Sequence, residues 1–222
     1  MLDKVKPTVQ LKDMSLFRQQ CYINGAWVDA DDKSTIPVYN PADGTLVGTV
    51  PKMGAAETKH AIETAHEAFK LWRAKTAKER AALMRKWFEL MIANTDDLAL
   101  LMTLEQGKPL AESKGEIGYG ASFIEWFSEE AKRVYGDVIP AQAPDKRIVV
   151  IKQPIGVCAA VTPWNFPNAM ITMVQPAAKA GPAFLVIIAL GKFHGVTAAH
   201  TPIGCLITTI RLSGACAGIT SP

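Results

Sequence analysis

The segment TPWNFP, residues 162–167, combines residue types and spacing suited to catalysis. One carboxamide, Asn165, stands between two prolines and two aromatic residues. Because proline fixes its own backbone and restricts the residue before it, we expect a stiff loop. A carboxamide held in an apolar setting can donate a strong hydrogen bond to developing negative charge, as an oxyanion hole requires. The alternative is that Asn165 only satisfies backbone groups of a turn, and the residue pattern alone favours this alternative.

The four cysteines are the candidate nucleophiles, and none has the surroundings that nucleophilic catalysis needs. They are Cys21, Cys158, Cys205 and Cys216, and no pair has CxxC spacing. We expect small, partly buried, reduced thiols, with Cys158 inside a buried strand. Covalent catalysis requires a nucleophile beside an activating base, and no such pair is evident.

Histidines and acidic residues gather on one predicted helix, which raises the question of a metal site. His60 and His66 share this helix with Glu63 and Glu67. No HExxH motif or Cys/His ligand set accompanies them, so we interpret them as a solvated helix surface and predict no metal site.

The elements around the TPWNFP loop indicate an α/β fold. The short, continuously apolar run at residues 156–161 is typical of a strand buried on both faces of a parallel sheet. A helix is predicted to begin at about Asn168. In open α/β sheets, ligands bind at the carboxyl ends of the strands, which is where the loop falls.

The residues before this strand are predicted to form a small β region and then helices. Asn24-Gly25 predicts a hairpin over residues 22–28, and a second turn at 40–44 separates two further strands. Apolar spacing and end signals predict four helices: over 55–73, from Thr76, from 95 to Gly107, and from Pro109 to about Tyr135. Thr76 and Glu79 form a capping-box signature at the start of the second helix. A strand is predicted to follow at 147–151. In the last of these helices, glycines 115, 118 and 120 are expected to permit close packing.

Composition and charge exclude some classes of function. The 222 residues are 49% hydrophobic and 20% charged, with a net charge of +3, which is too weak to indicate nucleic-acid binding. All 21 acidic residues precede residue 146, and six basic residues follow, but charge in that last part is sparse. The longest apolar run, residues 183–190, is far below the roughly 20 residues that span a bilayer. Without a signal peptide or a disulfide pattern, we expect a cytoplasmic protein.

Several segments together resemble the aldehyde dehydrogenase superfamily, in particular bacterial succinate-semialdehyde dehydrogenases. The resemblance covers about residues 15–172 and is carried by TPWNFP and by runs such as NPADGTLVGTVPKMGA, LMTLEQGKPLAESKGEI and KRIVVIKQPIGVCAAV. It implies an incomplete aldehyde-dehydrogenase-like fold, with an N-terminal β segment and helices followed by the first strands of a Rossmann-like parallel sheet. It also implies that residues 1–182 are a partial cofactor-binding region, and that residues 183–222 are a divergent tail without a family match.

The resemblance also implies a reaction and roles for residues. In the family, a catalytic cysteine adds to the aldehyde, the hemithioacetal gives a hydride to NAD or NADP, and water releases the acid. Asn165 is the implied donor to the oxyanion. Pro163, Trp164 and Asn165 are implied to line the nicotinamide end of the cofactor site. Residues 136–140 resemble the start of the family's oligomerisation arm, so a homo-oligomer or association with an intact homologue is expected.

The resemblance ends where the family's remaining machinery should follow. Beyond Ala183 no segment resembles the family's phosphate-binding glycines, its general-base glutamate or its nucleophile cysteine, and Met173 stands where the subfamily usually has an arginine for the substrate carboxylate. We therefore hypothesise a frameshifted or truncated reading frame, inactive alone towards a small-molecule aldehyde and not expected to hold the cofactor. The alternatives are a noncatalytic protein that pairs with full-length subunits, and an active enzyme rebuilt by the tail.

Overall fold

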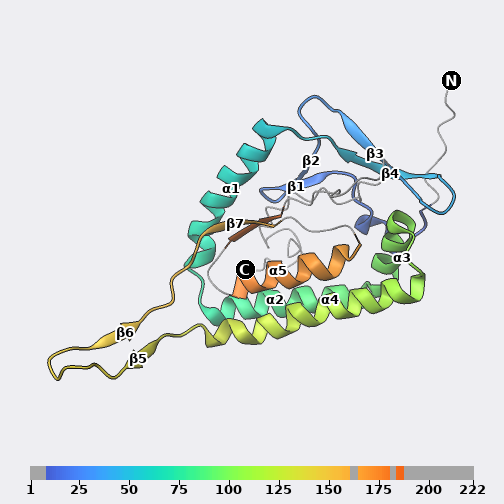
Figure 1. Cartoon of the computed structure of the whole chain (residues 1–222). Coiled ribbons are helices and arrows are strands. Elements are labelled where there is room, and N and C mark those ends of the chain that lie inside the picture. Colours follow the sequence, from blue (N-terminus) through green and yellow to red (C-terminus); the bar gives the residue numbers. More distant parts are fainter. Residues whose placement is uncertain (1–8, 161–164, 181–183, 188–222) are drawn as a thin grey trace, which may run out of the picture.

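The order of elements along the chain is β, then α, then α/β (Figure 1). The computed structural model describes residues 9–160, 165–180 and 184–187. The strands are β1 (Cys21–Ile23), β2 (Ala26–Val28), β3 (Thr35–Tyr39), β4 (Leu46–Pro51), β5 (Asp137–Ile139), β6 (Ile148–Val150), β7 (Val157–Ala160) and β8 (Phe184–Ile187). The α-helices are α1 (Ala55–Arg73), α2 (Ala77–Ala93), α3 (Thr95–Gln106), α4 (Leu110–Glu130) and α5 (Pro167–Ala180), with short 3₁₀ turns at Met14–Leu16 and Ala131–Arg133.

The two N-terminal hairpins form as the turn residues predict. β1 pairs antiparallel with β2, and the turn between them places Asn24 at φ 53° and Gly25 at φ 82°, which the Asn-Gly pair tolerates. β3 pairs antiparallel with β4 across the turn at residues 40–44. Both predicted hairpins are confirmed.

The helix boundaries follow the end signals in the sequence. Thr76 and Glu79 form the predicted capping box, with the Thr76 amide donating to Glu79 Oε2 at 2.7 Å. α3 stops at Gly107, whose φ of 77° is left-handed. α4 begins after Pro109 but ends at Glu130, earlier than predicted, because a 3₁₀ turn takes over.

Helices α2, α3 and α4 share one core, and α1 packs over the first hairpin in another. The first core joins Ile117, Ala121 and Ile124 of α4 to Met84 of α2 and other apolar side chains. Trp126 points away and is 64% exposed. The second core places Ile23 of β1 against the apolar face of α1, with Val157 of β7 beside it. The second core therefore ties the strand before the TPWNFP loop to the N-terminal part.

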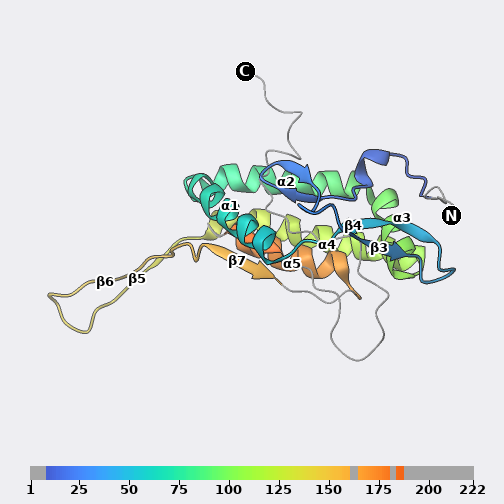
Figure 2. The same ribbon diagram turned by 90° about the horizontal axis from the view of Figure 1, so that it is seen from above.

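The β5–β6 hairpin projects from the rest of the molecule in both views (Figures 1 and 2). Several of its apolar side chains are exposed, including Val138 at 75% and Ile151 just after β6 at 74%. β6 confirms the strand predicted at 147–151, but its partner is the antiparallel β5 rather than a strand of the parallel sheet.

β7 and β8 pair in parallel, which confirms the first strands of a parallel sheet. α5 lies between them in the sequence and packs against α4 (Figure 1). β7 is half-buried rather than buried on both faces, because the sheet has two strands within the described residues. The predicted tail, residues 183–222, falls outside the described residues except for β8.

Candidate functional site

The candidate site is the loop that leads from β7 into α5. Asn165 and Phe166 are described, and both are exposed. Pro163 and Trp164, the other predicted members of the cofactor wall, lie outside the described residues. The structure therefore tests the surroundings of Asn165 and not the whole predicted wall.

The backbone carbonyl of Asn165 is held by two side chains from the corner between α3 and α4. Gln106 Nε2 donates to this oxygen at 2.6 Å, and Lys108 Nζ donates at 3.1 Å. Both donors lie more than fifty residues earlier in the chain. No hydrogen bond joins the Asn165 side-chain amide to another described residue, and the residue is exposed.

Lys108 is fixed in turn by an acidic residue and an aromatic ring. Its ammonium group is ion-paired with Glu116 of α4, and its Nζ lies 4.1 Å from the centre of the Phe166 ring. The side chains of Lys108 and Glu116 are only 11% and 2% exposed. A buried ion pair requires further hydrogen bonds to offset desolvation, and the Asn165 carbonyl provides one for Lys108.

Glu116 also binds the start of α5. Its Oε1 accepts hydrogen bonds from the backbone amides of Asn168 at 3.0 Å and Ala169 at 3.2 Å. These amides belong to the first turn of α5, where amides lack partners within the helix and the helix dipole favours negative charge. Asn168 Nδ2 donates to the backbone carbonyl of Glu116 at 3.2 Å, so α4 and α5 are joined reciprocally.

Gly120 allows α5 to approach α4 closely at this junction. A Cβ atom there would lie 2.1 Å from Asn168 Nδ2 and 2.7 Å from Thr172 Oγ1. Gly115 and Gly118, on the same helix, have open space where a Cβ would stand. The prediction that glycines of this helix permit close packing therefore holds for Gly120 alone.

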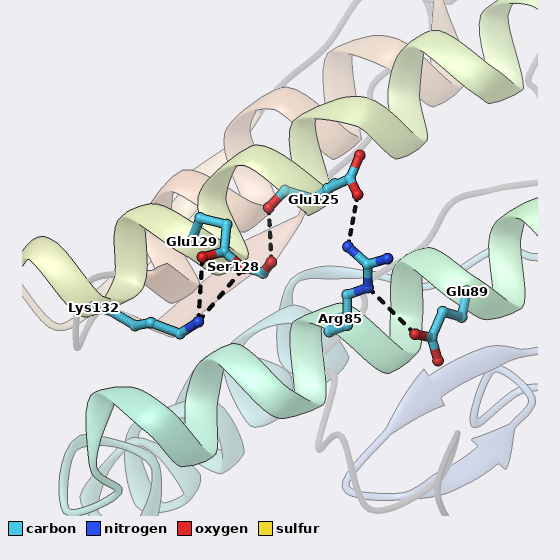
Figure 3. A network of polar contacts seen from close by, with 6 residues as sticks. All are labelled: Arg85, Glu89, Glu125, Ser128, Glu129 and Lys132. Carbon is cyan, nitrogen blue, oxygen red and sulfur yellow. Dashed lines mark hydrogen bonds and ion pairs between the residues drawn. The ribbon is translucent and has the colours of Figure 1, made fainter.

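A broad hollow on the outer side of α4 is lined by residues of α2, α4 and α5, including Trp126 and Met173. Arg85 of α2 lines it too, but its guanidinium donates to Glu125 at 2.6 Å and to Glu89 at 3.3 Å (Figure 3). Glu125 and then Glu89 raise the pKa of Arg85 above its ordinary value. This arginine is therefore already paired and is not a free partner for an anionic ligand.

The described cysteines do not face the loop as an activated pair. Cys21 is buried in β1, and Cys158 in β7 donates from its thiol to the carbonyl of Gly156 at 3.8 Å. Cys205 and Cys216 lie outside the described residues. His60 and His66 are exposed on α1, as expected for a solvated face. No group of three potential ligands that could hold a metal occurs among the described residues.

The profile of the aldehyde dehydrogenase family matches residues 27–188, which is more than half of the chain. The chain belongs to the aldehyde dehydrogenase family. Within the part that the structure describes, no helix is long and apolar enough to span a membrane, and the cytoplasmic location remains a prediction.

Two curated relatives are semialdehyde dehydrogenases. A glutarate-semialdehyde dehydrogenase from Pseudomonas aeruginosa is 69% identical over 175 residues, and an NADP-dependent succinate-semialdehyde dehydrogenase from Escherichia coli is 63% identical over 175 residues. Each alignment covers 79% of this chain but 35% of the relative. The chain thus spans about a third of the length of these relatives.

Solved structures show the same fold. The crystal structure of an NADP-dependent enzyme from Escherichia coli is 55% identical with a TM-score of 0.84, covering 95% of this chain and 42% of that one. A succinate-semialdehyde dehydrogenase from Burkholderia pseudomallei is 61% identical with a TM-score of 0.78, covering 80% of this chain and 37% of that one. The α/β fold is confirmed, and it is part of the complete fold of these enzymes.

Relatives of this family use NAD or NADP. In the part of the chain that the structure describes, only Asn165 belongs to the predicted nicotinamide wall. The described residues therefore do not make a complete dinucleotide site.

Gln106, Lys108 and Glu116 are the functional candidates that sequence reasoning did not single out. They lie in the run LEQGKPLAESKGEI, which carried part of the family resemblance, but nothing in their spacing indicated contact with a loop fifty residues later. Their role is visible only once α4 and α5 are placed side by side.

Proposed function

We propose that residues 15–172 form the oxyanion-stabilising part of an NAD(P)-dependent dehydrogenase that oxidises succinate semialdehyde or a related aldehyde to the acid. The observation that supports this most directly is the state of Asn165. Its carbonyl is occupied by Gln106 and Lys108, whereas its side-chain amide is exposed and makes no hydrogen bond to another described residue. The relatives that match this part of the chain carry the names of semialdehyde dehydrogenases.

The proposed task of Asn165 is to donate a hydrogen bond to the aldehyde oxygen. When a thiolate adds to the carbonyl carbon, the C=O π electrons move to the oxygen, which becomes negative. A donor aimed in advance at that oxygen lowers the barrier, and loss of one such donor costs about 10²–10³ in rate. The stiff attachment of the loop to α4 supports this role, because a pre-aligned donor needs no rearrangement during the reaction.

We further propose that the 222 residues do not turn over aldehyde alone, because they contain no suitable nucleophile and base. Cys21 is buried within a hairpin. Cys158 lies in β7, the strand that leads into the loop, and its sequence context does not resemble a nucleophile motif. Neither Cys205 nor Cys216 has a sequence context that resembles the family's nucleophile. We also propose that the partial cofactor-binding region ends at residue 182 and that a divergent tail begins at residue 183.

A second candidate function is noncatalytic association with intact dehydrogenase subunits. The observation that favours it is the projecting β5–β6 hairpin with its exposed Val138 and Ile151 (Figure 2). Exposed apolar side chains on a projecting hairpin are suited to burial against another chain. In this reading the chain would form a homo-oligomer or pair with a complete homologue.

The experiment uses the purified chain and a chimera. The chain alone, with succinate semialdehyde and NADP, should give no increase in the absorbance of reduced cofactor, and any turnover would refute the proposed inactivity. Adding the chain to the intact Escherichia coli relative then tests association, since altered activity of the relative would favour the second candidate.

The chimera tests Asn165 directly. Residues 15–172 of this chain replace the equivalent segment of the Escherichia coli relative, which supplies the remaining machinery. We expect turnover by the chimera and a decrease in kcat of about 10²–10³ for Asn165→Ala. Gln20→Ala, which removes a carboxamide beside the first hairpin that bonds only to Asp29 among the described hydrogen bonds, is the matched control and should leave kcat unchanged. Equal activity of the two variants would contradict the proposed role of Asn165.

A further inference from the structure

A chain of contacts connects three parts of the molecule at the base of the TPWNFP loop. It runs from the carbonyl of Asn165 through Lys108 to Glu116, and from Glu116 to the amides of Asn168 and Ala169. The contacts therefore hold the loop on both sides of Phe166 and Pro167. Apart from their contact with each other, the hydrogen bonds and the ring contact described for Lys108 and Glu116 join them to Asn165 and Phe166 or to the first turn of α5.

The burial of this ion pair distinguishes it from the other ion pairs that the structure describes. The side chains of Glu116 and Lys108 are 2% and 11% exposed, whereas the pair of Lys114 of α4 with Asp96 of α3 is about half exposed on each side. A buried pair is often no more stabilising than apolar residues of the same size, so its presence needs another explanation. Directional, charge-assisted hydrogen bonds provide one, because they fix geometry more narrowly than apolar packing.

We propose that Lys108 and Glu116 are positioning residues that set the direction of the Asn165 carboxamide. This inference rests on the proposed function of Asn165. Lys108 and Gln106 fix the peptide plane that follows Asn165, and Glu116 fixes the start of α5 directly beyond it. With the carbonyl of Asn165 and the start of α5 both held, the backbone on the carboxyl side of Asn165 is fixed, which narrows the directions that its amide can take. Neither Lys108 nor Glu116 is assigned a contact with the substrate.

The test is a double-mutant cycle in the chimera described above. Lys108→Met should lower kcat by about 10–100-fold, since a displacement of about 1 Å in a catalytic group has effects of this size. In a background that already carries Asn165→Ala, the same substitution should lower kcat by less than about threefold, because the group that Lys108 positions is gone. Lys108→Arg keeps the charge but presents its donors in a different geometry, so it should retain more activity than Lys108→Met and less than the parent.

The control is Lys114→Met, which removes a lysine six residues further along, in α4, together with an exposed ion pair. It should leave kcat unchanged in both backgrounds. If Lys108→Met prevents folding, as circular dichroism would show, Gln106→Leu takes its place in the cycle. This variant removes a neutral donor to the same carbonyl and leaves no buried charge unpaired.

The outcomes separate this inference from the function on which it rests. If Asn165→Ala lowers kcat while Lys108→Met lowers it equally in both backgrounds, or not at all, the positioning role is refuted and the oxyanion role stands. If Asn165→Ala leaves kcat unchanged, the proposed function fails and the positioning role fails with it. Only a loss of activity that depends on Asn165 supports both.

Discussion

The contact between α4 and α5 at Gly120 predicts that two glycine-to-alanine substitutions in α4 change the free energy of unfolding in opposite directions. Gly120→Ala places a methyl group where Asn168 Nδ2 lies 2.1 Å and Thr172 Oγ1 lies 2.7 Å from the new atom. Both atoms already hydrogen-bond, Asn168 to the carbonyl of Glu116 and Thr172 to carbonyls of its own helix. They therefore cannot move aside without losing those hydrogen bonds.

The expected change in the free energy of unfolding combines the gain in helix propensity with the cost of the close contact. Alanine is favoured over glycine in a helix by about 1 kcal/mol. Overpacking a close contact costs about 1–3 kcal/mol, and the hydrogen bond of Asn168 contributes about 1 kcal/mol that would be lost if the side chain turned away. We expect Gly120→Ala to destabilise the fold by about 1 kcal/mol net. Gly118→Ala, with open space at the same atom, should stabilise it by up to about 1 kcal/mol.

The assay is urea unfolding of the full chain followed by circular dichroism, with both variants and the parent protein measured side by side. The quantity compared is the free energy of unfolding, and the two alanines should differ by about 2 kcal/mol. If both alanines stabilise the protein to the same extent, α5 does not pack against α4 at Gly120. The geometry assigned to the base of the loop would then be wrong as well.

Three further predictions concern charges and caps. Lys108→Met should lower the free energy of unfolding by about 3 kcal/mol, because it leaves a buried carboxylate without its cation. Lys114→Met, which breaks an exposed pair, should lower it by no more than about 1 kcal/mol. Equal effects of the two substitutions in urea unfolding would contradict the burial of the Lys108–Glu116 pair. Asp96 accepts hydrogen bonds from two lysines, first from Lys114, which lower its pKa from 3.8 to about 2. Because the folded state lowers this pKa, its stabilisation is present above pH 3.8 and is lost as the pH falls towards about 2, and Asp96→Asn should reduce that acid sensitivity in unfolding experiments. Thr76→Ala should cost about 1 kcal/mol by removing the capping box of α2, and Thr76→Ser should restore most of this loss in thermal unfolding.

The elements that were predicted correctly have signals confined to a few neighbouring residues. Asn24-Gly25 specifies a hairpin turn, and Gly107 specifies a helix end, because each adopts a backbone conformation that other residues disfavour. The end of α4 was placed too late because no glycine or proline marks Glu130. The partner of β6 was not predicted, since strand pairing depends on contacts between distant segments.

The site was only partly predictable for the same reason. Asn165 was singled out as a candidate from the sequence because TPWNFP resembles a loop of the family, whereas the residue pattern alone favoured a turn. Lys108 and Glu116 were not, because their surroundings read as a polar corner and the start of a solvated helix. Only the packing of α5 on α4, which Gly120 permits, makes these two charges buried neighbours of the loop.

The direction of protein synthesis gives the Asn165 clamp a further consequence. Gln106, Lys108 and Glu116 leave the ribosome before Asn165, and the helices that carry them have their own apolar core. During translation, segments nearer the amino terminus are available for folding before the segments that follow them. The corner between α3 and α4 can thus fold before Asn165 leaves the ribosome, so that Asn165 docks on a surface that has already formed.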